Sequence, residues 1–160
     1  MSCHIGEYHY TESGLANIYL EGVEICSCAS CGETMTIIPA ITDLHSKIGQ
    51  ILLSKKSLLT GKEIKYLRKN MGLTATRLAE ILDVDNATIS RWERGPDRKI
   101  DKGYDRLLRL VYATIKGFSV DDNRRIVEGA FPEIAPEIVE ELPLMIPVET
   151  SRVENECRIS

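Results

Sequence analysis

The chain has 160 residues, a formal net charge of −4, 43% hydrophobic residues and 28% charged residues, a composition typical of a soluble globular protein with one ordinary domain or two small ones. No apolar run approaches the roughly 18 residues of a membrane span, and the N-terminus lacks the basic and apolar regions of a secretory signal, so we expect a cytoplasmic protein without a membrane partner. In that compartment, five cysteines favour reduced thiols or metal thiolates over a disulfide framework.

Charge is distributed unevenly along the chain. Residues 1–53 carry one Lys against six acidic residues, whereas residues 54–117 carry fifteen Lys or Arg against eight acidic residues, a net charge of +7. Residues 118–160 are acidic again, with four Arg against ten acidic residues. A basic middle segment between acidic flanks indicates a segment that meets a polyanion, although a solvated helical surface of mixed charge would give the same count.

Residues 1–38 are predicted to be rich in β-strands. Strand-forming residues stand there in short runs separated by turn residues: Tyr8, Tyr10, Ile18, Tyr19, Val23, Ile25, Ile37 and Ile38. Pro39 closes this part, and Asp43 is the predicted N-cap of a helix with one apolar face from Leu44 to Leu52.

Three cysteines, Cys26, Cys28 and Cys31, fall within six positions of the β-rich part. A Cys-x-x-Cys turn such as Cys28–Cys31, followed by Gly32, presents two thiolates to one tetrahedral zinc ion, and a second pair of ligands normally completes such a site. Cys3 is the expected third ligand, because strand-like segments between it and the turn can bring it back.

These residues resemble the YgiT-type zinc domain of MqsA-like antitoxins, in which a Cys-x-x-Cys near the N-terminus joins a second one. The segments 10–15 and 17–20 are similar to the region between the two pairs. The chain departs from the pattern after Cys3, because His4, Ile5 and Gly6 leave no cysteine before the glycine.

The resemblance implies one zinc ion per chain, with Cys3, Cys28 and Cys31 as ligands and the fourth position open. Cys26 is the leading candidate for that position, and His4 and His9 are weaker ones. Two further alternatives remain. One is a site with three protein ligands and a water molecule, and the other is a metal-free cluster in which the thiols pack as small apolar groups.

Residues 58–117 show the clearest helical pattern. A capping box at Thr60–Glu63 predicts a helix that stops at Gly72, and Thr74 is the predicted N-cap of the next helix. A short turn leads to a third helix over residues 86–94, and a further helix follows over residues 104–115.

The segment 74–95 combines two short helices, a tight turn and a predicted buried triad of Ala79, Val84 and Ile89. It resembles the Xre/Cro-like helix-turn-helix domain, and the resemblance covers about residues 58–117. Asp83 stands where the turn usually has Gly, and Asp tolerates the left-handed conformation better than most residues. Ala75 stands where a polar residue such as Gln is usual, so no phosphate or orienting contact is predicted from this side chain.

The resemblance implies that the third helix enters the major groove of DNA. Its predicted base-contacting residues are Asn86, Ala87 and Arg91, with Thr88 and Ser90 at the margin. The predicted phosphate contacts are Thr74, Thr76, Arg77, Arg94, Arg98 and Lys99. The helix over residues 104–115 is the expected dimer element, although its apolar face could equally cap the monomer core. A purely structural helical bundle is the alternative to DNA binding.

Residues 118–160 extend beyond both resemblances. A helix is predicted from Asp121 or Asp122 to about Ala130, and another from Pro136 through Leu142, with a polar tail beyond Pro147. Four apolar residues could form a stripe for a dimer or a partner, or pack locally: Ile134, Ile138, Val139 and Leu142.

Together these patterns predict an α+β protein of three parts. Residues 1–55 form a zinc-ribbon-like β-rich domain with a trailing helix, residues 56–117 form an all-α helix-turn-helix domain, and residues 118–160 form an acidic helical extension and tail. We expect a repressor that binds a palindromic operator as a homodimer and acts as the antitoxin of a toxin partner. The alternative is a stand-alone phage or plasmid regulator. The sequence contains no nucleophile elbow, phosphate loop or paired-carboxylate motif, so we do not expect an enzyme.

Overall fold

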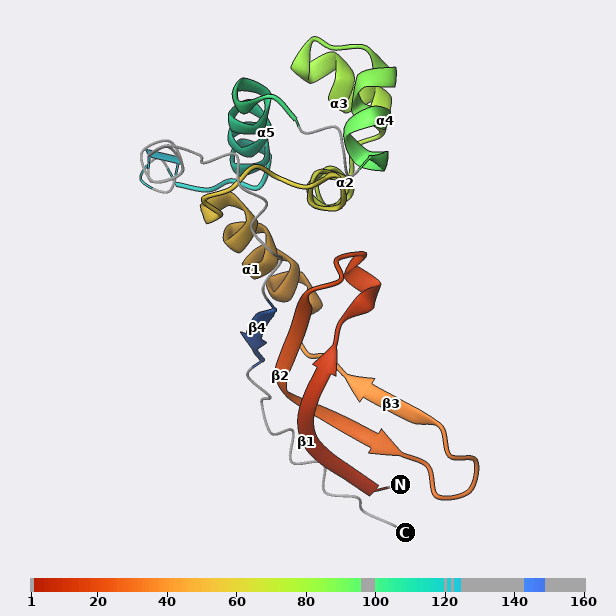
Figure 1. Cartoon of the computed structure of the whole chain (residues 1–160). Coiled ribbons are helices and arrows are strands. Elements are labelled where there is room, and N and C mark those ends of the chain that lie inside the picture. The colour runs from red at the N-terminus through yellow and green to blue at the C-terminus, as the bar shows by residue number, and fades with distance from the viewer. Residues whose placement is uncertain (1, 96–99, 120, 122, 125–142, 149–160) are drawn as a thin grey trace. The chain divides into compact units, whose positions relative to one another are not determined.

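The computed structural model describes residues 2–95, 100–119, 121, 123–124 and 143–148. The described elements, in chain order, are β1 (Ser2–His9), η1 (Thr11–Ser13), β2 (Ile18–Ser27), β3 (Thr34–Ile37), α1 (Ile41–Ser54), α2 (Gly61–Asn70), α3 (Ala75–Leu82), α4 (Asn86–Arg94), α5 (Lys102–Ile115) and β4 (Leu144–Pro147) (Figure 1). They divide into two compact units, of which the first holds residues 2–12, 16–44 and 143–148 and the second holds the rest. Strands therefore precede a helical region, as the predicted α+β layout requires. The division falls after residue 44, whereas the sequence placed a boundary after residue 55.

The first unit is built around β2. Strand β1 pairs antiparallel with β2 along its length, and β3 pairs antiparallel with residues 24–27 of β2. Gly6 lies opposite Val23 and Glu7 opposite Glu21, so Gly22 is an extra residue in β2. Gly22 has a φ of 78°, the left-handed conformation that a glycine bulge requires. The bulge bends β2 between its two halves.

The C-terminal extension contributes a strand to this sheet, which the sequence did not predict. Strand β4 pairs in parallel with residues 18–21 of β2, so that Leu144 lies opposite Ile18. The Leu144 amide donates to the Asn17 carbonyl at 2.7 Å, and the Val148 amide donates to the Glu21 carbonyl at 2.9 Å. Ile146 is buried. The extension is therefore not wholly helical and tail-like, because β4 supplies hydrogen-bonding partners along the half of β2 that β3 does not reach.

Other expectations for the extension cannot be placed. The predicted helix through Leu142 and its apolar stripe lie outside the described residues, as does Cys157. The predicted helix near Asp121 is described only in part, at residues 121 and 123–124.

Helix α1 begins two residues before the predicted N-cap at Asp43. Ala40 has a φ of 48°, and its carbonyl accepts from the amides of Asp43 and Leu44 at 2.9 and 3.1 Å. This left-handed residue after Pro39 starts the helix, so Asp43 lies within the first turn, where its negative charge suits the helix dipole.

The second unit follows the predicted capping pattern closely. The Thr60 hydroxyl accepts from the Glu63 amide at 3.3 Å, while the Glu63 carboxylate accepts from the Thr60 amide at 2.7 Å, so the capping box is confirmed. The Thr74 hydroxyl accepts from the Arg77 amide at 3.1 Å and starts α3. Leu67, Leu78 and Ile89 are fully buried and form the centre of the helical core, with Trp92 beside them: these four come from α2, α3 and α4.

A buried ion pair joins the segment that precedes α2 to α5. Arg109 is 1% exposed and Asp105 is fully buried, and the guanidinium donates to the carboxylate at 2.8 Å. The same guanidinium donates to four backbone carbonyls, those of Leu52, Leu53, Lys55 and Ser57, at 2.7–3.3 Å. The Asp105 carboxylate also accepts from the Leu59 amide at 2.8 Å. Arg109 thereby satisfies carbonyls at the end of α1 that no intrahelical amide can reach.

None of the helices in the described ranges has the length and apolar character needed to cross a lipid bilayer.

Candidate nucleic-acid interface and cysteine sites

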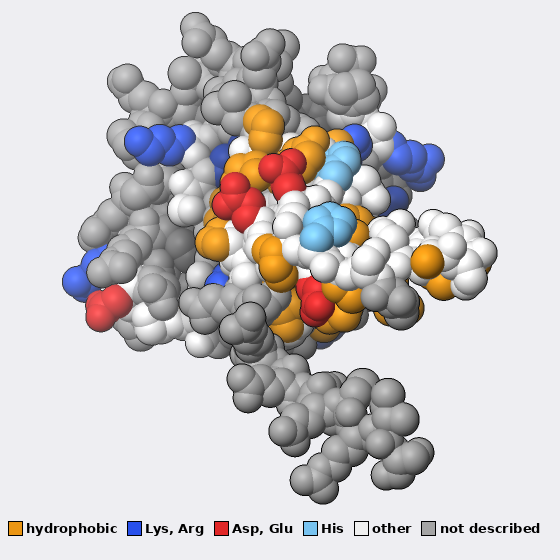
Figure 2. Space-filling model, turned by 90° about the horizontal axis from the view of Figure 1, so that it is seen from below, with side chains coloured by type: hydrophobic (Ala, Val, Ile, Leu, Met, Phe, Trp, Pro, Cys, Tyr) orange, Lys and Arg blue, Asp and Glu red, His pale blue; other side chains and the backbone are white. Residues whose placement is uncertain are grey.

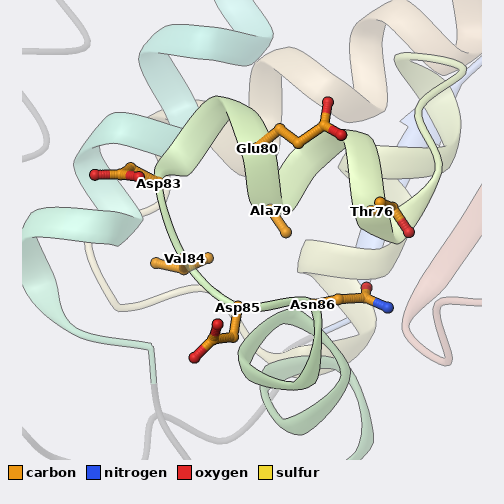
Figure 3. Close-up of a pocket in the computed structure, with 7 residues that line it drawn as sticks. All are labelled: Thr76, Ala79, Glu80, Asp83, Val84, Asp85 and Asn86. Carbon is orange, nitrogen blue, oxygen red and sulfur yellow. The ribbon is translucent and has the colours of Figure 1, made fainter.

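The turn between α3 and α4 adopts the geometry that the sequence predicted. Asp83 has a φ of 53° and a ψ of 50°, so it takes the left-handed conformation in place of glycine. The Val84 amide donates to the Ala79 carbonyl at 3.0 Å. Ala79 and Ile89 are buried, while Val84 is half-buried between them. The small Ala79 side chain therefore lets α3 and α4 approach each other, as Figure 3 shows around the hollow between the two helices.

Helix α4 is fixed to α2 by a two-pronged ion pair. Arg68 donates from Nε and Nη2 to the two carboxylate oxygens of Glu93 at 2.6 and 2.9 Å, and from Nη1 to the Leu73 carbonyl at 2.9 Å. Both side chains are about nine-tenths buried, and the hydrogen bonds to Glu93 raise the pKa of the Arg68 guanidinium. The paired geometry holds the C-terminal half of α4 in one orientation.

The first residue of α2 approaches the last turn of α4 very closely. A Cβ atom added at Gly61 would lie 2.4 Å from the Trp92 carbonyl oxygen and 3.0 Å from the Glu93 carbonyl oxygen. The sequence marked Gly61 only as part of a capping box. The structure shows that its missing side chain allows α4 to pack against the start of α2.

We expect Gly61→Ala to lower the free energy of unfolding by about 1–3 kcal/mol, because the backbone of α4 must move to admit the methyl group. Alanine is otherwise the better helix former, so helix propensity alone predicts the opposite sign. Urea denaturation followed by circular dichroism measures the change. Lys62→Ala, at the exposed neighbouring position, is the control and should change the value by about 0.5 kcal/mol or less. A stabilised Gly61→Ala protein would contradict the close approach.

One face of α4 points away from the core. It carries five of the residues predicted to bind DNA, which line a shallow hollow: Asn86, Ala87, Ser90, Arg91 and Arg94. Asn86, Ala87, Arg91 and Arg94 are exposed, whereas Thr88 and Ser90 are half-buried. Within the described part of the chain, neither Arg91 nor Arg94 forms an ion pair. The two guanidinium groups are therefore available to an incoming anion or base edge.

The predicted phosphate contacts on α3 lie at its N-terminal end. Thr74, Thr76 and Arg77 are exposed there. Arg77 donates to Glu80 at 2.7 Å, but both side chains are more than half exposed, so this ion pair adds little stability and can exchange for a phosphate. Arg98 and Lys99 lie outside the described residues.

The structure also places acidic groups next to this surface, which the sequence interpretation did not select. Glu80, Asp83 and Asp85 line the hollow between α3 and α4, and Asn86 closes it on the α4 side. They could have been found in the sequence, where Glu80 lies in the last turn of α3 and Asp83 and Asp85 stand directly before α4. Their negative charge disfavours a phosphate at the hollow itself, so the basic edge formed by Arg91 and Arg94 is the better anion site.

The cysteines of the first unit fall into two groups. Cys3 lies directly opposite Cys26 in the β1–β2 pair, with the two Cα atoms 4.0 Å apart, and a disulfide joins them. The sequence favoured reduced thiols, and the pairing arises because the register brings two strand residues 23 positions apart face to face. Glu24 joins this group: one carboxylate oxygen and the two sulfur atoms lie within 4.8 Å of one another. Two thiolates and a carboxylate can bind a metal ion when the disulfide is reduced. The cysteine and histidine pattern of the sequence does not point to Glu24.

The predicted Cys-x-x-Cys turn forms the second group. The Gly32 amide donates to the Cys28 carbonyl at 2.9 Å, and Gly32 has a φ of 74°. Cys28 and Cys31 are free thiols. Hydrogen bonds to the Cys28 sulfur lower the pKa of its thiol to about 6. The Ser30 hydroxyl makes the largest contribution, and the backbone amides of Cys31 and Ser30 add to it. The turn therefore favours a thiolate, as a metal-binding turn requires.

The structure does not bring the four predicted zinc ligands into one cluster of the described residues. Cys3 and Cys26 group with Glu24, without Cys28 and Cys31. His4 lies opposite Ile25, so it faces the other side of the sheet from Cys3. The His9 ring stacks on Tyr19 and its Nε2 atom bonds the Ala16 carbonyl at 2.7 Å. Neither histidine joins the cysteine group.

Comparison with known proteins locates one recognised domain. Residues 64–104 match the helix-turn-helix family. The chain is similar to the HTH-type transcriptional regulator DicA of Escherichia coli (strain K12), with 32% identity over 59 residues that make up 37% of this chain and 44% of that protein. The similarity thus spans less than half of the relative, and no solved structure matches the chain significantly. The matched residues include most of α2, all of α3 and α4 and the start of α5, so this part of the chain is a helix-turn-helix domain.

Proposed function

We propose that the protein is a sequence-specific DNA-binding transcriptional regulator. The observation that carries the proposal is the outward face of α4, which displays Asn86, Arg91 and Arg94 on the second helix of a helix-turn-helix domain. The similarity to the HTH-type transcriptional regulator DicA supports the same class. The net charge of +7 over residues 54–117 supports a polyanionic ligand.

In this proposal α4 lies in the major groove with its N-terminal residues toward the bases. Arg91 has the fork of donors that pairs with guanine, and Asn86 has the amide that pairs with adenine. Arg94 and Arg77 contact the phosphates that flank the groove, which sets the register of the protein on DNA. The Arg68–Glu93 ion pair serves this function indirectly, because it fixes the orientation of α4.

The experiment is binding of the full chain to DNA from upstream of its own gene, followed by footprinting. The regulator should protect a discrete site and its affinity should fall steeply with salt, with a slope of about −0.9 in log–log form for each phosphate neutralised. Equal affinity for unrelated DNA of the same length would contradict sequence-specific binding.

We further propose that the protein binds a palindromic operator as a homodimer. Helix α5 buries one face through Leu108 and Tyr112 but leaves Leu107 and Ile115 40% and 46% exposed, with Val111 half-buried between them. These three residues are spaced by four positions, so they form a second apolar stripe along α5. Two recognition helices can then enter major grooves about 34 Å apart. Sedimentation equilibrium tests this: a dimer is expected, and Leu107→Glu should shift the protein toward monomer.

The specific biological role that we propose is that of an antitoxin that represses its own promoter. This rests on the resemblance of the N-terminal segment to the zinc domain of MqsA-like antitoxins and on its acidic character, which suits a basic protein partner. The alternative is a stand-alone phage or plasmid regulator. A small neighbouring gene that is toxic when expressed alone, and whose product co-purifies with the full chain, supports the antitoxin role. A protein that represses its promoter without such a neighbour supports the alternative.

A further inference from the structure

The register of the first unit gathers a chemically unusual row on one face of the sheet. Cys3, Cys26 and Met35 lie side by side across β1, β2 and β3. Ile5, Glu24 and Ile37 form the next row on the same face, two residues along each strand. A single carboxylate therefore stands among apolar side chains and next to two sulfur atoms. Figure 2 looks onto the first unit, where hydrophobic and acidic side chains gather.

We propose that reduction of the Cys3–Cys26 disulfide creates a metal site in which these two thiolates and the Glu24 carboxylate bind one Zn²⁺, with a fourth position left to water. The proposal does not depend on DNA binding by the second unit. It also differs from the zinc site predicted from sequence, because Glu24 replaces the Cys28–Cys31 turn as the source of ligands.

The geometry suits this set of donors. One oxygen of Glu24 and the two sulfur atoms already lie within 4.8 Å of one another. In a tetrahedral site with Zn–S bonds of about 2.3 Å, two sulfur atoms lie about 3.8 Å apart. The Cα atoms of Cys3 and Cys26 are 4.0 Å apart, so rotation of the freed side chains about χ1 is enough to reach that separation without moving the strands.

The chemistry of the step balances with a dithiol as reductant. The dithiol transfers two electrons and two protons to the Cys3–Cys26 bond and becomes a disulfide itself, which leaves two protein thiols. Metal binding then releases the two thiol protons, because only thiolates bind Zn²⁺ well. Cys3 is exposed, so a dithiol can reach the bond. In the oxidised protein the two sulfur atoms carry no charge and the site lacks its strongest ligands.

The surroundings of Glu24 favour a metal ion over other partners. Among the described residues, no Lys, Arg or His forms an ion pair with Glu24. The neighbours on its face include Ile5 and Ile37, which are 63% and 46% exposed. Apolar neighbours strengthen the attraction between a half-buried carboxylate and a cation, because they exclude part of the competing water. Two thiolates with one carboxylate select a borderline-soft ion such as Zn²⁺ over Mg²⁺ or Ca²⁺.

The test uses the full chain with Cys28→Ser, Cys31→Ser and Cys157→Ser, so that Cys3 and Cys26 supply the only sulfur ligands from cysteine. The protein is titrated with Co²⁺, a coloured substitute for Zn²⁺, before and after reduction with dithiothreitol and its removal without oxygen. We expect thiolate-to-cobalt absorption at one Co²⁺ per chain in the reduced protein and none in the oxidised protein. Zn²⁺ should displace the cobalt.

Glu24→Gln is the decisive variant, because it keeps the size of the side chain and removes its charge. We expect it to weaken Co²⁺ binding to the reduced protein by about tenfold or more, whereas Glu21→Gln, at an exposed position of the same strand, should leave binding unchanged. Circular dichroism shows whether each variant is folded. The proposal is overturned if the oxidised and reduced proteins bind Co²⁺ equally, if Glu24→Gln binds as well as its parent, or if binding requires Cys28 and Cys31.

Discussion

Arg109→Met is expected to lower the free energy of unfolding by about 3–5 kcal/mol, the usual cost of removing one member of a buried ion pair. The change leaves the fully buried Asp105 carboxylate with the Leu59 amide as its remaining described partner. It also removes a donor to the carbonyls of Leu52, Leu53, Lys55 and Ser57, of which the Leu52 carbonyl keeps the Lys55 amide at 3.4 Å. Methionine fills much of the space of the arginine stem, so the loss comes from unpaired polar groups rather than from a cavity.

Chemical denaturation of the full chain measures this prediction. Lys102→Met is the control, because Lys102 is an exposed residue of the same helix and its loss should cost about 0.5 kcal/mol or less. Asp105→Asn should cost less than Arg109→Met, since asparagine can still accept from the Leu59 amide and the Arg109 guanidinium keeps its four backbone carbonyls as acceptors. Equal stability of Arg109→Met and Lys102→Met would show that the segment before α2 holds its position without the guanidinium.

The helical domain could be predicted from the sequence because its signals are local. A capping box, an N-cap threonine and an interrupted apolar period each involve residues within one or two turns, and the bounds of α4 agree with the prediction at both ends. The left-handed conformation of Asp83 could also be anticipated, because Asp is one of the few residues other than glycine that tolerate it. The outward position of Arg91 follows from the same helical period that buries Ile89 and Trp92.

The features that the sequence did not reveal depend on pairings between distant residues. Strand β4 lies more than 100 positions from its partner strand, and three apolar residues between two prolines give no periodic signal. The Cys3–Cys26 pair and the place of Glu24 beside it depend on the β1–β2 register, which a glycine bulge shifts by one residue. The Asp105–Arg109 pair has the i,i+4 spacing of an ordinary surface ion pair. The sequence does not show that this pair is buried, because its burial depends on the end of α1, whose carbonyls accept hydrogen bonds from Arg109.

Arg91→Ala is expected to reduce the preference of the protein for its operator over unrelated DNA by a factor of about 5–150, equivalent to about 1–3 kcal/mol. Arg91 is exposed on the outward face of α4 and forms no ion pair within the described residues, so its loss should leave folding intact. Nonspecific, salt-sensitive binding should persist, because the phosphate contacts remain. Titration of operator and unrelated duplexes at several salt concentrations measures both quantities.

Two further variants separate the charge of Arg91 from its shape. Arg91→Lys keeps the charge but loses the planar fork of donors, so it should lose most of the selectivity while it keeps the salt dependence. Arg94→Ala should instead weaken binding to all sequences alike and reduce the salt slope by about one, as expected for a phosphate contact. If Arg91→Ala and Arg94→Ala behaved alike, Arg91 would contact the DNA backbone. Helix α4 would then have to be rotated in the groove, so that Asn86 alone on this face contacts base edges.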